Sequence, residues 1–156
     1  MRTNNHQGFS LIELLIVVTI IGIVASIAIP NLLASRRAAN EGSAQQSMRT
    51  ISSCEATYQY TYGNGGFADL STLGARTLTD SVLATGQKSG YNFVATPIAG
   101  PPSQYWLYAV PVTTSGIGQT GTRRFGITED AVLRVDSTLS APADAAAVKA
   151  MPPLGN

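Results

Sequence analysis

The chain has 156 residues, of which 44% are hydrophobic and only 12% charged, so it is apolar for a single globular domain. Its ten basic and nine acidic residues nearly cancel, which excludes a global electric field that would attract nucleic acid or a charged substrate. The single cysteine, Cys54, excludes an internal disulfide. We therefore expect partners to be recognised by packing, and part of the chain to meet lipid or another subunit.

A long apolar segment follows a short polar start. Residues 14–35 carry no formal charge, and as a helix these 22 residues would be about 33 Å long, enough to cross a hydrocarbon core of about 30 Å. A cleaved secretory signal would have a shorter apolar stretch, ending at an Ala-x-Ala type site. A single domain of this size also has too little structure to bury such a helix on all sides. The segment therefore predicts a membrane-spanning helix.

The residues at the start of this segment carry a more specific signal. A polar leader, MRTNNHQG, is followed directly by FSLIELL. The run GFSLIELLIVVTIIGIVASIAIP closely resembles the prepilin cleavage and methylation signature of type IV pilins and type II secretion pseudopilins. It combines a glycine before the cut, an aromatic residue after it, a lone glutamate and a helix-bending proline. The resemblance covers residues 1 to about 35.

The resemblance implies two processing residues and one assembly residue. A membrane-bound prepilin peptidase and N-methyltransferase would cut after Gly8 and methylate the new amine of Phe9. Glu13 is an ionisable group in a membrane helix and therefore a functional candidate. The S-x-x-E spacing of Ser10 and Glu13 predicts a capping box, whereas the resemblance implies that Glu13 pairs with the Phe9 ammonium of a neighbouring subunit inside a filament. The two roles need not exclude each other.

Gly22 and Pro30 are expected to weaken the helix. Pro30 has no amide hydrogen and its ring clashes with the carbonyl group of Ser26, so we expect a kink or local melting there. Gly22 lowers helix propensity in the same stretch. The resemblance implies that the backbone loosens between these residues when the subunit leaves the membrane for the filament. An ordinary kinked membrane helix is the alternative.

The remainder of the chain predicts a small β-rich head. Beyond Pro30 the helix is expected to continue to about Tyr62, because one face repeats at alternating steps of four and three residues. A loop from Gly63 to about Gly90 follows, with a short helical turn in FADLSTLG. Strand signals then lie in YNFVATPI from Tyr91, YWLYAVPV from Tyr105, RRFGIT from Arg123 and AVLRVD from Ala131.

We therefore predict an α+β fold: a long N-terminal hydrophobic helix packed at its C-terminal half on a small antiparallel β-sheet, the lollipop of the pilin family. Residues after Ser137 are poor in bulky apolar side chains and predict a tail that is only partly ordered. The expected parts are a leader (1–8), a transmembrane and filament-core helix (9–35), an amphipathic half of the helix (36–62), a β-rich head (63–136) and a C-terminal tail (137–156).

The chain offers little for catalysis or metal binding. Its single histidine, His6, falls in the leader, so the mature chain would have no imidazole base or histidine ligand, and we expect no enzyme activity and no cofactor. Two isolated arginine pairs do not predict nucleic-acid binding. Four acidic residues of the head lack a calcium-loop spacing, so we predict no metal site and interpret them as solvated charges: Glu129, Asp130, Asp136 and Asp144.

The resemblance implies a structural subunit of a type IV pilus-like filament, stored in the inner membrane with its head outside the cytoplasm. Its implied partners are identical or related pilin subunits, the prepilin peptidase, an inner-membrane assembly platform with its ATPase, and membrane lipid. The fibre would serve adhesion, motility or secretion. The positive-inside rule alone favours the opposite orientation, because Arg36 and Arg37 follow the span while Arg2 precedes it. We instead infer the orientation from the leader, because a prepilin peptidase acts on the cytoplasmic face of the membrane.

Two alternatives stay open at this point. One is a pseudopilin whose short periplasmic fibre belongs to a type II secretion system. The other, from a different class, is a membrane-anchored periplasmic binding domain that never polymerises, and such a protein would need neither Gly8 nor Glu13.

Overall fold

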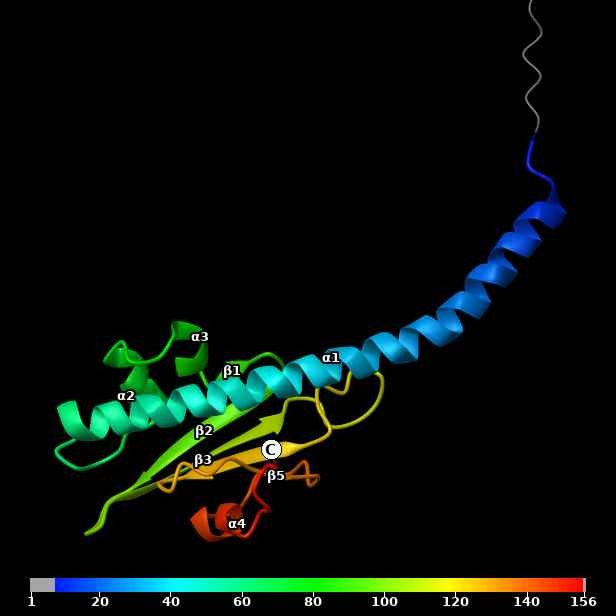
Figure 1. Cartoon of the computed structure of the whole chain (residues 1–156). Helices are drawn as coiled ribbons and strands as arrows, with labels where there is room; N and C mark the ends of the chain where they lie inside the picture. Colours follow the sequence, from blue (N-terminus) through cyan, green and yellow to red (C-terminus); the bar gives the residue numbers. More distant parts are fainter. Residues whose placement is uncertain (1–7, 156) are drawn as a thin grey trace, which may run out of the picture. The chain divides into compact units, whose positions relative to one another are not determined.

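The computed structural model describes residues 8–155, so most of the predicted leader lies outside the described part. The expected α+β fold is confirmed: a long helix, α1, precedes an antiparallel sheet with short helices around it (Figure 1). The elements are α1 (Leu11–Thr61), α2 (Leu70–Ala75), α3 (Ser81–Ala84), β1 (Gln87–Lys88), β2 (Tyr91–Ile98), β3 (Gln104–Pro111), β4 (Arg124–Thr128), β5 (Arg134–Asp136) and α4 (Ala145–Lys149).

The chain separates into two compact units, Met1–Ser35 and Arg36–Asn156. The boundary falls at the end of the uncharged segment, although α1 contributes residues to both units. We call Arg36–Asn156 the head. The division arises because the first unit has no sheet to pack on within itself, whereas the head has its own hydrophobic core.

The sheet is a meander in which each strand pairs with the next one in the sequence. The order is β1-β2-β3-β4-β5 and the pairs are antiparallel. The longest ladder joins β2 to β3, from Tyr91 opposite Pro111 to Ile98 opposite Gln104. Both prolines of these strands, Pro97 and Pro111, lie at or next to a strand end, where the missing amide disturbs the ladder least.

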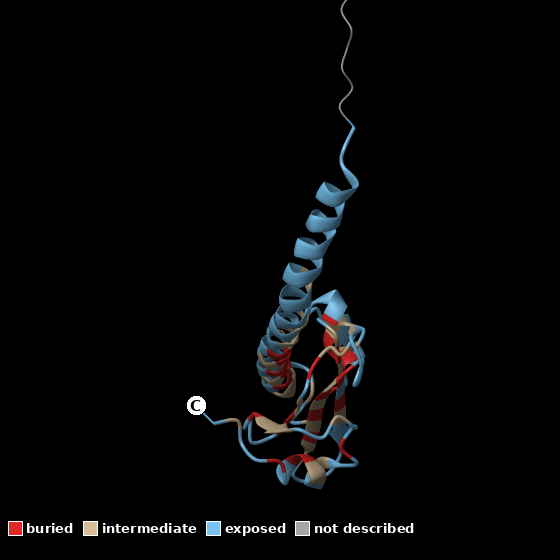
Figure 2. Cartoon of the chain, turned by 90° about the vertical axis from the view of Figure 1, so that its right-hand side faces the viewer, coloured by how far each residue is buried: buried red, intermediate tan, exposed pale blue. Residues whose placement is uncertain are grey.

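The core lies between one face of the sheet and the head part of α1. Side chains of β3 alternate strictly between half-buried and buried, because successive residues of a strand point to opposite faces. On α1 the buried apolar residues Ala44, Met48 and Ile51 recur at helical spacing and join the sheet residues in one cluster. Figure 2 shows this buried face of the helix in red, turned toward the sheet. One face of the head part of α1 therefore packs on the sheet, as the expected α+β fold requires.

The end of α1 and the following loop use the expected residues. The amide of Gly63 donates to the carbonyl oxygen of Tyr58 at 2.7 Å, and the chain then turns through Asn64 and Gly65, which have φ angles of 46° and 89°. Such angles are easily adopted by asparagine and glycine. The expected helical turn in FADLSTLG is α2, whose first turn is capped by the carboxylate of Asp69.

An ion pair between buried Glu41 and partly exposed Arg123 ties α1 to the β3–β4 loop, residues 112–123. Glu41 is buried and accepts hydrogen bonds from the amide and hydroxyl of Thr122, both at 2.7 Å, and from the guanidinium of Arg123. Burial alone would raise the pKa of Glu41, but these hydrogen bonds and the positive charge lower it below its ordinary value. The pair therefore stays charged at neutral pH and holds the loop on the helix.

The C-terminal residues differ from the expected loose tail. Helix α4 lies within them, Val148 and Met151 are buried, and the amide of Leu154 donates to the carbonyl oxygen of Leu133 at 2.8 Å. They pack over Gly126 of β4, where an added Cβ would lie 2.6 Å from Val148. Only a glycine allows this close approach. Residues 137–155 are therefore part of the folded head.

Three details of the head also differ from expectation. Helix α3 and the two-residue strand β1 were not predicted. The last strand does not begin at Ala131, because this residue has a φ of 57° and its amide closes a turn onto Thr128. β5 therefore covers only the last three residues of the predicted strand.

Because the head has its own core, we expect a chain of residues 36–156 to be a soluble, folded monomer. It retains Glu41, the sheet and α4, and it lacks the uncharged segment. The measurement is sedimentation together with thermal unfolding followed by near-ultraviolet circular dichroism, with the full-length chain in detergent as the control. A fragment that aggregates, or that unfolds without a cooperative transition, would contradict the separation at Ser35.

Candidate functional site

Three of the predicted site residues, Gly8, Phe9 and Glu13, lie at the start of α1. Gly8, Phe9 and Ser10 precede the helix and are exposed, and Phe9 is 89% exposed. The amide of Ser10 donates to Oε2 of Glu13 at 2.9 Å, and the amide of Leu14 donates to the carbonyl oxygen of Ser10. This is the carboxylate half of a capping box. The structure thus shows Glu13 in its capping role.

The capping bond does not occupy the whole carboxylate. It uses Oε2 of Glu13, which is exposed, and an exposed carboxylate oxygen has room for a second partner. Capping and pairing with a neighbouring ammonium are therefore compatible in geometry. The pairing itself stays a prediction, because it concerns a second subunit.

Gly8 has no packing role in the described chain. A Cβ built on it meets nothing within 4 Å, and the same holds for Gly22 inside the helix. A larger side chain at position 8 would therefore not disturb the folded subunit. Any effect of such a change would therefore arise outside the folded subunit.

The described residues of the first unit present an exposed apolar surface. Over the described residues, α1 is the one helix that is long and apolar enough to cross a membrane, by length and composition alone. Its large apolar side chains between Phe9 and Leu32 are exposed, as the pale blue of Figure 2 shows. Thr19 and Ser26 donate their hydroxyls to carbonyl oxygens of the same helix. These polar groups are therefore satisfied without water, as a lipid environment requires.

Helix α1 is continuous through both predicted weak points. Its assigned range includes Gly22 and Pro30, so the helix is unbroken in the isolated subunit. Loss of helical structure between these residues was expected on transfer to a filament. Melting of the helix in the filament therefore remains a prediction.

The four acidic residues that were considered for calcium are engaged in the head. Glu129 pairs with Lys149, Asp130 with Arg134 and Asp136 with Arg124, while Asp144 caps α4. The bonds from Arg134 lower the pKa of Asp130 to about 2, against the opposing effect of burial. These residues are solvated, as expected, and they also stabilise the β4–β5 turn, the pairing of β4 with β5 and the start of α4.

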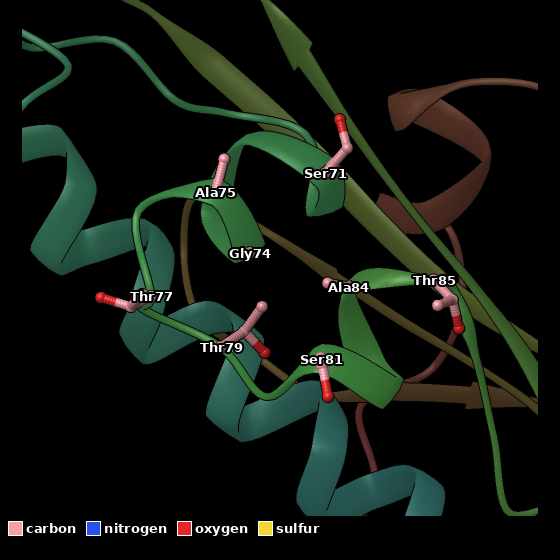
Figure 3. A pocket seen from close by; sticks show the side chains of 8 residues that line it. All are labelled: Ser71, Gly74, Ala75, Thr77, Thr79, Ser81, Ala84 and Thr85. Carbon is pink, nitrogen blue, oxygen red and sulfur yellow. The ribbon is translucent and has the colours of Figure 1, made fainter.

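Figure 3 shows a cavity of about 460 Å³ beside α2 and α3. The residues around it are small or carry a hydroxyl group, and they contribute no acid, base or thiol. It therefore lacks the paired groups that general acid–base or nucleophilic catalysis needs. The lining residues are Ser71, Gly74, Ala75, Thr77, Thr79, Ser81, Ala84 and Thr85.

Comparison with known proteins identifies similarity in the N-terminal segment. Residues 3–29 match the family model of the prokaryotic N-terminal methylation motif. A stretch of 37 residues is 62% identical to the type IV wide pilus major component PilA4 of Thermus thermophilus. The match covers 24% of this chain and 28% of that protein, so the chain spans little more than a quarter of the relative. No solved structure gives a significant match.

The matched region includes Gly8, Phe9, Glu13 and Gly22, and the α+β fold of the chain agrees with the family resemblance. That family consists of structural subunits rather than enzymes. The N-terminal segment of this chain therefore carries the prokaryotic N-terminal methylation motif, and over this part the chain is similar to a type IV pilus component.

Proposed function

We propose that the chain is the structural subunit of a type IV pilus-like filament, processed by a prepilin peptidase and assembled from the inner membrane. One observation carries the proposal. The methylation motif coincides with the first part of α1, residues 11–35, where the large apolar side chains are exposed, the hydroxyls of Thr19 and Ser26 are satisfied internally, and the one acid, Glu13, lies about one turn from the proposed cut.

In the storage state, residues 9–35 lie in the bilayer and the head lies outside the cytoplasm. The exposed apolar residues of the first unit are stable there, because lipid replaces the protein contacts that they lack. The peptidase acts on the cytoplasmic side, which orients the chain despite Arg36 and Arg37. Cleavage removes the polar leader and keeps the anchor.

In the filament, the same apolar surface packs against the helices of other copies. Each subunit contributes the methylated amine of Phe9 and the carboxylate of Glu13, and pairing between neighbours keeps both charges from being buried alone. The assembly platform and its ATPase supply the work of extraction. The fibre, rather than the monomer, carries adhesion, motility or secretion.

The similarity to PilA4 favours a surface pilus over a secretion pseudopilus. PilA4 is named as the major component of a wide pilus. Detection of this chain in fibres sheared from the cell surface would support the same assignment. Its restriction to the periplasm would favour the pseudopilus.

We expect the mature chain to begin at Phe9 with one added N-methyl group, and Gly8→Val to leave a full-length precursor in the membrane. The substitution meets no atoms of the folded chain, so it acts on recognition by the peptidase. Mass spectrometry of the N-terminal peptide from wild-type and variant membranes measures both outcomes. Gly22→Ala serves as a matched control, since a Cβ is also unobstructed there, and it should be processed normally.

An uncleaved wild-type N-terminus would contradict the proposal. It would favour the membrane-anchored binding domain that does not polymerise. Normal cleavage of Gly8→Val would show instead that the cut lies elsewhere.

A further inference from the structure

The β3–β4 loop has a base that is anchored on the helix. The side chain of Arg37 donates to Oε1 of Gln119 at 3.1 Å, and the amide of the Asn40 side chain donates to the carbonyl oxygen of Thr120 at 2.9 Å. In Figure 1 the loop, drawn in yellow, lies beside α1 at this level. The base of the loop is thus fixed to the first turns of α1 in the head.

The tip of the same loop, residues 112–118, is exposed along its whole length. It is closed by the amide of Thr120, which donates to the carbonyl oxygen of Thr113 at 3.0 Å. Ile117 is 82% exposed and lies between Gly116 and Gly118. Residues 112–122 carry no formal charge. The tip therefore presents an uncharged polar surface with one large apolar side chain.

The anchoring residues follow closely on the uncharged segment. Asn40 lies five residues after Ser35, which is about 8 Å along a helix axis. Because the proposed function places residues 9–35 in the bilayer, the five residues that join Ser35 to Asn40 keep the base of the loop within about 18 Å of the end of the membrane segment. Arg36 is exposed in the same turn. A guanidinium at the level of the lipid headgroups binds the phosphates of anionic lipids, and an apolar side chain without charged neighbours is stable in the interface.

We propose that the loop tip and Arg36 form a membrane-contact surface that seats the head on an anionic bilayer while the subunit is stored. Ile117 enters the interface and Arg36 binds phospholipid headgroups. The inference rests on the proposed function, since it requires the preceding segment to cross the membrane. The positive-inside rule disfavours an arginine on the outer side of the span. Binding to lipid phosphates would provide Arg36 with a partner there.

The test uses the full chain reconstituted in vesicles of phosphatidylcholine and phosphatidylglycerol that contain a nitroxide-labelled lipid at headgroup depth. Ile117→Cys carries an environment-sensitive fluorophore. The matched control is Tyr60→Cys, since Tyr60 is 87% exposed and lies on α1 about 36 Å beyond Arg36. The native thiol of Cys54 is buried and donates to the carbonyl oxygen of Leu78, so the unsubstituted chain should take up no label.

We expect the nitroxide lipid to remove most of the fluorescence at position 117 and to leave position 60 unchanged. Arg36→Gln should reduce the quenching at position 117 in anionic vesicles but not in pure phosphatidylcholine. Equal quenching at both positions in a chain that resists carbonate extraction would overturn the membrane contact alone. A chain that carbonate removes from the vesicles would overturn both the contact and the proposed membrane anchoring. Shielding of position 117 only in filaments would assign the loop to a contact between copies and overturn the lipid partner.

Discussion

Glu13→Val is expected to abolish filament formation while insertion and cleavage after Gly8 continue. The substitution keeps the segment apolar and removes the carboxylate. In the filament, each incoming subunit would then bury the Phe9 ammonium without its partner, which costs roughly 3 to 5 kcal/mol. A cost of this size at every subunit addition stops polymer growth. The measurement is the ratio of protein in sheared fibres to cleaved protein in the membrane.

The capping bond predicts a much smaller effect. The amide of Ser10 donates to the Glu13 carboxylate, and loss of such a cap costs about 1 kcal/mol in a helix that lipid already stabilises. If capping were its only role, Glu13→Val would assemble almost normally. The size of the assembly defect therefore separates the two roles.

Glu13→Gln is the matched control, because its amide oxygen can still accept from Ser10 but carries no charge. We expect it to fail in assembly like the valine variant. Abundant fibres from Glu13→Val would refute the pairing role. Fibres restored by Glu13→Gln would show that the hydrogen bond to Ser10 is what assembly needs.

The central strands could be predicted from sequence because their residues decide the structure locally. β2 to β4 are rich in aromatic and β-branched residues between clear breaks, and the structure places them within one residue of expectation. β1 is only two residues long, and its pairing with Asn92 and Tyr91 depends on the neighbouring strand rather than on its own composition. It could not be read from the chain.

The ordered C-terminal segment could not be predicted from its own composition. Its alanines and prolines indicate weak packing, yet the buried side chains of Val148 and Met151 pack against the backbone of Gly126, which has no side chain in their way. The available signal was the glycine inside a predicted strand, since such a residue often marks a close approach by another part of the chain. Which part of the chain packs on this glycine depends on the tertiary structure and cannot be predicted from the local sequence.

For the N-terminal site, the sequence predicted the positions of the residues better than the structure of one chain can show their function. The motif predicted the positions of Gly8, Phe9 and Glu13 and the capping contact with Ser10. The proposed pairing of Glu13 with Phe9 joins two subunits, so one chain cannot display it. Glu55 lies on the packed face of α1, and its position in the helix does not indicate whether a buried acid has a cationic partner.

Glu55 is fully buried and has no cationic partner among residues 8–155. Its Oε2 accepts the amide of Ala68 at 3.0 Å, and Oε1 has no hydrogen-bond partner in the described part of the chain. Burial raises the pKa of Glu55 to about 7; the negative charge of Asp69 adds to the shift and the Ala68 amide opposes it. At acidic pH the carboxyl is therefore neutral in the folded head.

The raised pKa predicts a head that loses stability as the pH rises. Between the ordinary pKa of about 4.5 and the folded value of about 7, the folded state binds a proton that the unfolded state has released, so the free energy of unfolding falls with increasing pH. The full difference between the two limits is about 3 kcal/mol. Other carboxylates with lowered pKa values, such as Asp130 and Glu41, act in the opposite direction, but at lower pH.

Glu55→Gln should remove this pH dependence, because the amide cannot ionise and its oxygen can still accept from Ala68. For the wild-type head, we expect the free energy of unfolding to fall by about 2 kcal/mol between about pH 5.5 and 8.5, and the variant to be the more stable protein at the upper end. Urea unfolding of the two heads at several pH values, followed by circular dichroism, measures this difference. The comparison cancels groups that both proteins share, including the chain terminus. Parallel pH profiles for the two proteins would show that Glu55 is ionised in the folded head, and that a bound water or a shift of the chain satisfies its second oxygen.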